Sequence, residues 1–249
     1  MKTDMKYKIL NRDIIKYIAI FAMTLSHIAE SGIVPFAEGT KALHELFIGI
    51  GNFTAVTMCY FLVEGYEYTK SKKQYGIRLL VFAVFSQISF YLVFQNKTLN
   101  VIFTLLCCFL ILVVRERIFN VNMKWILIFV LVAATIYGDW PLIAPACTLM
   151  FVSNKGNIRN MKLSYLAAFI MFTLIDLINE FTKYTLPAAV LVSFLKGISI
   201  LLSGVVVLYF YNGKRAQHGQ TFSKWFFYLY YPVHLLVIGL LAGRSFMLP

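Results

Sequence analysis

The feature that most constrains this chain is a series of long apolar segments separated by short polar connections. Of its 249 residues, 60% are hydrophobic and 14% are charged, whereas a soluble domain carries roughly 25% charged residues. No polar block is large enough to fold outside a membrane, and within a bilayer only helices and closed barrels satisfy their backbone hydrogen bonds. The sequence therefore predicts an all-α integral membrane protein with a single domain over residues 1–249.

Nine apolar segments are candidates for transmembrane helices. They cover residues 13–34, 43–66, 75–95, 98–114, 123–138, 140–153, 161–181, 187–211 and 222–243. The fifth and sixth are short and are separated only by Gly138-Asp139-Trp140-Pro141. Residues 123–153 thus form either two full spans or a re-entrant hairpin, and we expect about nine transmembrane helices in one bundle.

The loop charges predict the orientation of this bundle. With the N-terminus in the cytosol, most Lys and Arg residues fall in cytosolic loops, and only Lys41, Lys97, Lys183 and Arg244 fall in loops outside. This bias follows the positive-inside rule, and an odd number of spans places the C-terminus outside the cytosol. The net charge of +12 therefore indicates cytosolic loops at a lipid bilayer and not nucleic-acid binding.

The cysteines all fall within apolar segments, which indicates small buried side chains without a disulfide framework. They are Cys59, Cys107, Cys108 and Cys147. We find no metal-binding spacing, glycine-rich phosphate loop or nucleophile elbow in the sequence.

The first apolar segment carries two ionisable residues on one stripe. Lys16 and His27 lie eleven residues apart, with Ile20 and Met23 between them on the same face. The two polar groups are thus separated by roughly 16 Å along the helix axis. An ionisable group within a membrane costs about 2.5–3.5 kcal/mol on insertion scales and is a functional candidate. His27 could act as a general base, oriented by Thr24 and Glu30, or could join neighbouring helices by a hydrogen bond.

The last apolar segment holds a second histidine, His234, on one face with Tyr230 and Tyr231. Pro232 removes a backbone hydrogen bond from this helix, and a histidine beside such a distortion indicates a polar cavity. Its aromatic start is also typical of an interfacial belt.

Other polar residues within the spans are candidates for substrate contacts or for interhelical hydrogen bonds. Glu64 could pair with Arg78 or another loop cation, and Asp176 could pair with Lys196. The remaining candidates are Gln87, Asn100 and Thr104. His44 and His218 fall in expected loops and receive no function.

In these residues the chain resembles the TraX family of membrane proteins, which acetylate the N-terminus of conjugative pilin. The matches follow the same order along the chain as in the family. They are Lys16, Met23 and His27; Glu64, Gly65 and Thr69; Tyr75, Arg78 and Leu79; Ser86 and Gln87; Asn100 and Thr104; and Tyr231, Pro232, His234 and Leu235. The chain departs from the family at Ser26, where aspartate is common, and at Gly51-Asn52, where a glycine-arginine pair is common. The spacing of Lys16 and His27 is also similar to that of a more distant group, the acyltransferase 3 family.

The resemblance implies a membrane acetyltransferase that uses cytosolic acetyl-CoA as co-substrate. Lys16 and Arg78 would hold the donor phosphates, His27 and His234 would be the catalytic histidines, and Tyr231 would help to place the thioester. The acceptor would be an amine or hydroxyl of a peptide, a pilin or a surface glycan. A proton-linked transporter, or an immunity or scaffold protein without catalysis, remains the alternative reading of the same buried polar groups.

Overall fold

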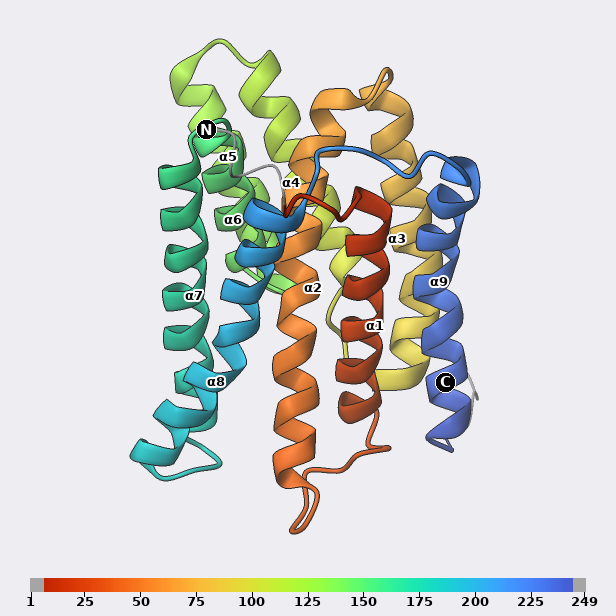
Figure 1. The fold of residues 1–249 in the computed structure, drawn as a ribbon, viewed down its shortest axis with the longest axis vertical. Coiled ribbons are helices and arrows are strands. Elements are labelled where there is room, and N and C mark those ends of the chain that lie inside the picture. Colours follow the sequence, from red (N-terminus) through yellow and green to blue (C-terminus); the bar gives the residue numbers. More distant parts are fainter. Residues whose placement is uncertain (1–6, 244–249) are drawn as a thin grey trace.

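The computed structural model describes residues 7–243, and this part of the chain is a bundle of α-helices without β-strands (Figure 1). Its nine α-helices are α1 (Arg12–Glu30), α2 (Lys41–Tyr68), α3 (Lys72–Phe94), α4 (Val101–Arg117), α5 (Val121–Ala134), α6 (Ile143–Asn154), α7 (Ile158–Glu180), α8 (Leu186–Val205) and α9 (Gln220–Leu241). A 3₁₀ turn, η2 (Thr135–Tyr137), follows α5, and a π-helical segment, η3 (Val206–Phe210), follows α8.

Each apolar segment of the sequence corresponds to one of these helices, with small differences at the ends. One of them concerns α1, which ends at Glu30 and not at Val34. Gly32 adopts a φ of +91° directly after it, a left-handed conformation that ends a helix and that glycine accepts without strain. His44 also differs from its expected loop position, because α2 begins at Lys41 and includes it.

Five helices in the described part of the chain are long and apolar enough to cross a membrane: α2, α3, α7, α9, and α8 together with η3. Helices α5 and α6 have 14 and 12 residues. These lengths correspond to roughly 21 and 18 Å, compared with about 30 Å for a hydrocarbon core. The helices support an all-α membrane protein, and the count of nine spans and the orientation of the termini stay predictions.

The helices alternate in direction, so that α1 begins where α2 ends (Figure 1). Helix α1 packs along α2 and contacts α9, which in turn packs on α3. On the other side of α2, α8 packs between α2 and α7, and α4 and α6 also contact α2. Helix α1 thus lies between α2 and α9, and the side chains of these two helices surround its polar stripe.

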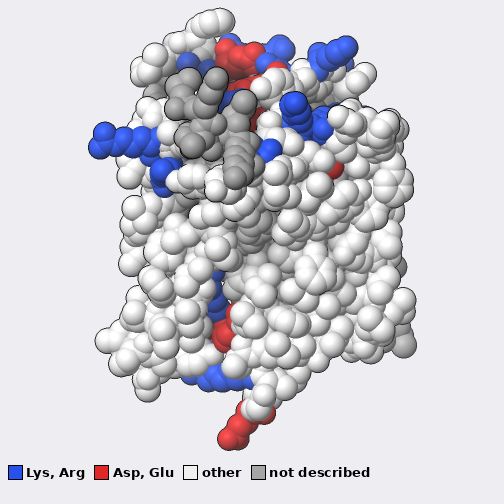
Figure 2. Space-filling model, in the orientation of Figure 1, with Lys and Arg blue, Asp and Glu red and all other residues white. Residues whose placement is uncertain are grey.

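Basic side chains gather at the end of the bundle where α1 begins, whereas the middle of the surface is almost uncharged (Figure 2). We call this the basic end, and the opposite end, where α1 finishes at Glu30, the distal end. An uncharged belt between two polar ends is what a bilayer requires. Three of the basic residues considered for orientation, Lys2, Lys6 and Arg244, lie outside the described residues.

Polar N-caps begin four of the five described helices that start at the basic end, the exception being α9, which follows Gly219. In each, a side-chain oxygen accepts a hydrogen bond from a backbone amide of the first turn, which satisfies an otherwise free donor. These caps are Asn11 for α1, Ser71 for α3, Asn120 for α5 and Asn157 for α7. These polar residues therefore set the first residue of four helices.

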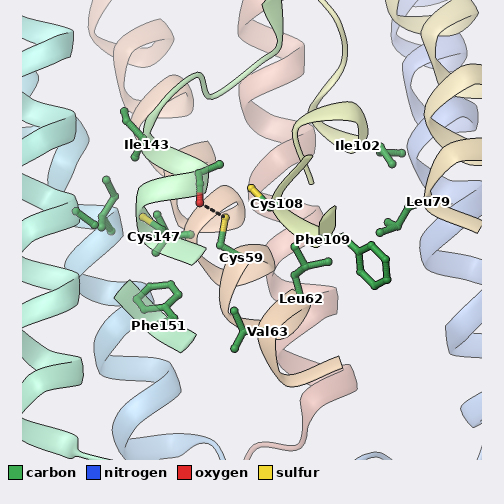
Figure 3. Close-up of a cluster of buried hydrophobic side chains, with 14 of the residues drawn as sticks. Cys59, Leu62, Val63, Leu79, Ile102, Cys108, Phe109, Ile143, Cys147 and Phe151 are labelled. Atoms are coloured by element: carbon green, nitrogen blue, oxygen red, sulfur yellow. Dashed lines mark hydrogen bonds between the residues drawn. The ribbon is translucent and has the colours of Figure 1, made fainter. Parts of the chain in front are cut away.

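The largest apolar cluster fills the centre of the bundle between α2, α4 and α6 (Figure 3). Cys59, Cys108 and Cys147 lie within it, and the thiol of Cys59 donates to the carbonyl of Ala144 at 3.7 Å. All four cysteines are free thiols. The three buried ones fill space as small apolar side chains, in agreement with the sequence prediction.

Candidate functional site

A single face of α1 lines an internal cavity of about 480 Å³. Its lining residues on α1 recur at spacings of three and four, which is one stripe of a helix. They are Arg12, Asp13, Lys16, Ile20, Met23, Ser26, His27 and Glu30. From Arg12 to Glu30 the stripe extends over roughly 27 Å. The predicted stripe with Lys16 and His27 thus faces one continuous space that begins at the basic end and reaches the distal end of α1.

At the basic end, five cationic side chains line the cavity. They are Arg12, Lys16, Arg78, Arg215 and Lys224. Asp13 also lies there, and its carboxylate accepts a hydrogen bond from the backbone amide of Ala216 at 2.7 Å. Cations that outnumber carboxylates in a cleft favour an anionic ligand.

The two cations predicted from sequence have few protein partners. The ammonium of Lys16 lies over the rings of Phe227 and Phe61, at 5.1 and 6.0 Å from their centroids. Arg78 lies over the ring of Tyr75 at 5.7 Å, and its buried Nε makes no hydrogen bond among the described residues. Both groups are therefore available to a ligand.

Glu64 lies just outside the cavity and neutralises Arg12. Its carboxylate is 3.7 Å from Nε of Arg12 and accepts a hydrogen bond from the hydroxyl of Tyr211 at 2.8 Å. Glu64 therefore pairs with Arg12, at the start of α1, and not with Arg78. Glu64 thus holds the side chain of Arg12 at the basic end of the cavity, although it does not line the cavity itself.

Towards the distal end the lining contains acidic side chains in place of cationic ones. They are those of Glu30 and Asp139. The hydroxyl of Ser26 donates to Glu30 at 3.3 Å. A Cβ built on Gly51 would lie 2.3 Å from Cβ of Ser26, so α1 and α2 touch backbone to side chain at this point. Ser26 and Gly51-Asn52, the two departures from the family pattern, are therefore neighbours in space.

His27 and His234 meet at the distal part of the cavity, although they are 207 residues apart. Nδ1 of His27 lies 2.9 Å from Nε2 of His234, and the two rings are nearly parallel at 12°. His27 lines the cavity, whereas His234 lies behind it and does not. His234 therefore reaches the cavity only through the ring of His27.

Thr24 and Glu30, which were expected to orient the ring of His27, form hydrogen bonds with other residues. Thr24 hydrogen-bonds to the hydroxyl of Tyr230 at 2.7 Å and donates to the carbonyl of Ile20. Glu30 bonds to Ser26, as described above. Neither touches His27, and His234 alone provides its ring with a hydrogen bond among the described residues.

Tyr231 lies in the cavity wall beside His27. Its side chain is 4% exposed, and its ring meets that of His27 edge to face at 6.0 Å. The buried hydroxyl makes no hydrogen bond among the described residues. A buried hydroxyl without a protein partner is costly unless a ligand or water satisfies it, which makes Tyr231 a candidate donor to a bound group.

Three further candidates from sequence form hydrogen bonds at two neighbouring connections, α3–α4 and α5–α6. The amide nitrogen of Asn100 donates to Gln87 at 2.9 Å and to the carbonyl of Ala83, and its oxygen caps α4. The hydroxyl of Thr104 donates to the carbonyl of Asp139 at 2.6 Å. None of the three lines the cavity. Gln87 and Asn100 hold the α3–α4 connection, in which the carbonyl of Leu99 accepts from the amide of Asp139. Thr104 holds Asp139 directly.

Asp176 lies away from the cavity, in an ionic cluster that joins α2, α7 and α8. Its expected partner Lys196 is 3.8 Å away. Lys196 is closer to Glu45, at 2.6 Å, and to Glu180, at 2.9 Å. The expected pair is thus part of a larger group of charges that lies away from the cavity.

Several residues that line the cavity were not singled out in the sequence. Arg215 and Lys224 belong to the connection before α9 and its first turns, and Asp139 and Trp140 to the tip of the α5–α6 hairpin. The positive-inside bias places Arg215 and Lys224 at the correct end, and the tight Gly138–Pro141 turn marks the hairpin tip. Only the tertiary structure brings them to one cavity.

The geometry defines a helical membrane protein with an internal path from a cationic entrance to a histidine and two carboxylates. The chain matches the model of the family described as "TraX protein" over residues 11–242. A protein of Dichelobacter nodosus, described as "Probable fimbrial assembly protein FimC, serogroup H1", is 32% identical over 238 residues, which cover 90% of this chain and 92% of that protein. No solved structure matches. The chain belongs to the TraX family.

Proposed function

We propose that the protein is a membrane acetyltransferase that moves an acetyl group from cytosolic acetyl-CoA to an amine. The observation that carries this proposal is the separation of charge within one cavity, cationic at the basic end and acidic beside His27 at the distal end. An anionic donor and a cationic acceptor would each enter at the end whose charge attracts it. The fimbrial relative supports a pilin or another exported peptide as the acceptor.

The basic end would hold the phosphates of the donor. Lys16 and Arg78 have no carboxylate partner among the described residues, and Arg215 and Lys224 add to the positive field. Guanidinium and ammonium groups are the usual ligands of phosphate oxygens. Ile20 and Met23 provide an apolar wall between Lys16 and His27, which suits the pantetheine arm with its thioester directed towards His27.

His27 would act as the general base for the transfer. An acceptor that arrives as an ammonium ion would first give one proton to the carboxylate of Glu30 or Asp139. The neutral nitrogen would then attack the thioester carbonyl, so that a C–N bond forms and the C–S bond breaks. His27 accepts the proton that the nitrogen loses and returns it to the leaving thiolate. The hydroxyl of Tyr231 would donate a hydrogen bond to the oxyanion of the tetrahedral intermediate.

The acidic residues favour an amine over a sugar hydroxyl as the acceptor. At neutral pH a free amine is mostly an ammonium ion, which Glu30 and Asp139 would attract to the distal end. A neutral glycan gains nothing from this field. The predicted orientation places this end on the extracytoplasmic side of a bacterial cytoplasmic membrane.

The purified protein in detergent tests this proposal. We expect it to transfer labelled acetyl from acetyl-CoA to peptides with a free N-terminus, as detected by mass spectrometry. His27→Ala should reduce transfer by about 10²-fold or more. Lys97→Ala, in an exposed loop at the distal end, is the control. Equal transfer by His27→Ala and the native protein would refute the general base.

The alternative is a proton-linked transporter, or an immunity or scaffold protein, that uses the cavity without catalysis. The extension of one cavity from Arg12 to Glu30 is the observation that favours transport. A thermal-shift titration with coenzyme A separates these functions. The acetyltransferase requires stabilisation by coenzyme A that is lost in Lys16→Met, and a transporter of other solutes gives no response.

A further inference from the structure

Three groups form a hydrogen-bonded chain behind the cavity wall: the ring of His27, the ring of His234 and the backbone carbonyl of Tyr230. Nδ1 of His27 is 2.9 Å from Nε2 of His234, and Nδ1 of His234 is 2.8 Å from the carbonyl oxygen of Tyr230. His27 and His234 are 5% and 7% exposed. Water therefore has little access to either ring.

The carbonyl at the end of this chain decides where the protons are. A carbonyl oxygen only accepts, so Nδ1 of His234 carries a proton and donates it to Tyr230. In a neutral His234 the second nitrogen, Nε2, is then an acceptor. Nδ1 of His27 must therefore donate to it, which leaves Nε2 of His27 with a free lone pair.

The free nitrogen is the one on the ligand side. His27 lines the cavity and His234 does not, so Nδ1 faces the protein and Nε2 remains for a ligand. Nε2 makes no hydrogen bond with any other residue that the structure describes. An imidazole bound in this way presents a base to the cavity and not an N–H group.

Aromatic neighbours hold the two rings in this arrangement. The ring of Tyr230 stacks on that of His234 at 4.8 Å and 11°. Phe94 packs edge to face on His27 at 5.5 Å. Tyr230 itself is held by its hydroxyl, which bonds to Thr24 on α1. The hydrogen bonds of the chain are therefore preorganised between α1 and α9.

We propose that His234 is a positioning residue which fixes the tautomer of His27 and shares the proton that His27 accepts. This inference rests on the proposed function. When Nε2 of His27 takes a proton from the acceptor, the proton on its Nδ1 can move to Nε2 of His234. His234 then carries the positive charge, with its Nδ1 proton still bound by the carbonyl of Tyr230. The reverse transfers bring a proton back to Nε2 of His27 for the leaving thiolate, so no other reactant is needed.

A histidine that only joins two helices would leave the tautomer of His27 unspecified. Nitrogen chemical shifts of ¹⁵N-histidine distinguish the tautomers directly. The measurement uses His44→Gln/His218→Gln, which retains only the two histidines of the pair. We expect His27 with a protonated Nδ1 and a bare Nε2, and His234 with a protonated Nδ1. A protonated Nε2 on a neutral His27 would overturn the inference.

Two substitutions of His234 separate its effects. In His234→Gln the amide oxygen can still accept from Nδ1 of His27 but cannot take a proton, whereas His234→Leu removes the acceptor. We expect the His27 tautomer to persist in His234→Gln and to be lost in His234→Leu. An unchanged tautomer in His234→Leu would exclude His234 as the group that fixes it.

Acetyl transfer provides the second readout. We expect kcat to fall by about 10²-fold or more in His234→Leu and by less in His234→Gln, with KM for acetyl-CoA unchanged in both. Lys97→Ala, in an exposed loop away from both histidines, is the control and should retain the tautomer and kcat. Equal kcat in both His234 variants would exclude the orienting effect. The tautomer is measured without turnover, so a native protein with the expected tautomer and no acetyl transfer would refute the proposed function alone.

Discussion

The hydroxyl of Thr104 on α4 donates a hydrogen bond to the backbone carbonyl of Asp139 at the tip of the α5–α6 hairpin, with 2.6 Å between the two oxygens. The backbone of Gly138 also lies close to the Thr104 side chain, because a Cβ built on Gly138 would lie 2.4 Å from Oγ1 of Thr104. On the other side of the tip, the amide of Asp139 donates to the carbonyl of Leu99 at 2.8 Å. The start of α4 thus holds one of the two distal carboxylates of the cavity in place.

Removal of this hydroxyl should release the hairpin tip. We expect Thr104→Val to lower the free energy of unfolding by about 1–3 kcal/mol, because the carbonyl of Asp139 loses its donor. KM for the acceptor should rise and KM for acetyl-CoA should not. Thr98→Val is the matched control, since the hydroxyl of Thr98 bonds only within its exposed loop. Steady-state kinetics and thermal unfolding in detergent provide the test, and equal effects of both variants would contradict the role of Thr104.

The close contact of Gly51 with Ser26 predicts a steric coupling between α1 and α2. Gly51→Ala places a methyl group 2.3 Å from Cβ of Ser26 and should destabilise the protein by about 1–3 kcal/mol. Ser26→Gly makes room for it, so the double variant should recover much of the loss. A double-mutant cycle of unfolding free energies measures this coupling. Additive effects of the two substitutions would show that the helices can separate without cost.

The buried Lys196 predicts a large effect away from the cavity. Lys196→Met leaves Glu45, Asp176 and Glu180 near one another without their shared cation. We expect a loss of about 3–5 kcal/mol, because a buried charge is left without its partner. Lys183→Met removes a half-exposed lysine from the same cluster and should have an effect of about 1 kcal/mol or less. Thermal unfolding of both variants compares the two losses of stability, and equal losses would contradict the greater contribution of the buried Lys196.

The acidic end of the cavity predicts the preference for the acceptor. Glu30→Gln and Asp139→Asn keep the shapes of the side chains and remove their charges. Each should raise KM for a peptide with a free N-terminus by about ten-fold, or 1.4 kcal/mol. Neither should change KM for acetyl-CoA, which we expect at the opposite end. Competition between an amine and a hydroxyl acceptor at two salt concentrations measures the effect, and a preference for the hydroxyl acceptor in the native protein would exclude the electrostatic attraction.

What the sequence predicted correctly depends on local geometry. The positions of the helices follow from apolar runs and polar caps, and the shared face of Lys16 and His27 follows from the period of one helix. Both residues indeed line one cavity. The contact between His27 and His234 could not be derived in this way, because two helices distant in sequence must first pack together. For the same reason, sequence could not place Asp139 opposite α1 or identify Glu45 and Glu180 as the closest partners of Lys196.

The two departures from the family pattern gain a physical meaning only in the structure. Ser26 and Asn52 stand where the family commonly has an aspartate and an arginine, and Ser26 touches Gly51, the neighbour of Asn52. Asn52 donates to the carbonyl of Lys196 at 3.2 Å. Loss of one acidic and one basic residue at adjacent positions leaves the local net charge unchanged. In the sequence the two changes are 26 residues apart, and nothing there links them.

The shortness of α5 has a consequence for the lipid around the protein. Its surface is apolar and outward-facing, with Ile126, Phe129 and Val130 more than half exposed. A helix of 14 residues cannot match a hydrocarbon layer of about 30 Å, so acyl chains beside it must compress. The bilayer is therefore expected to be thinnest next to the hairpin that carries Asp139. The peptide acceptor that we propose would meet a shallow depression there, and its end would have less hydrocarbon to cross before it reached His27.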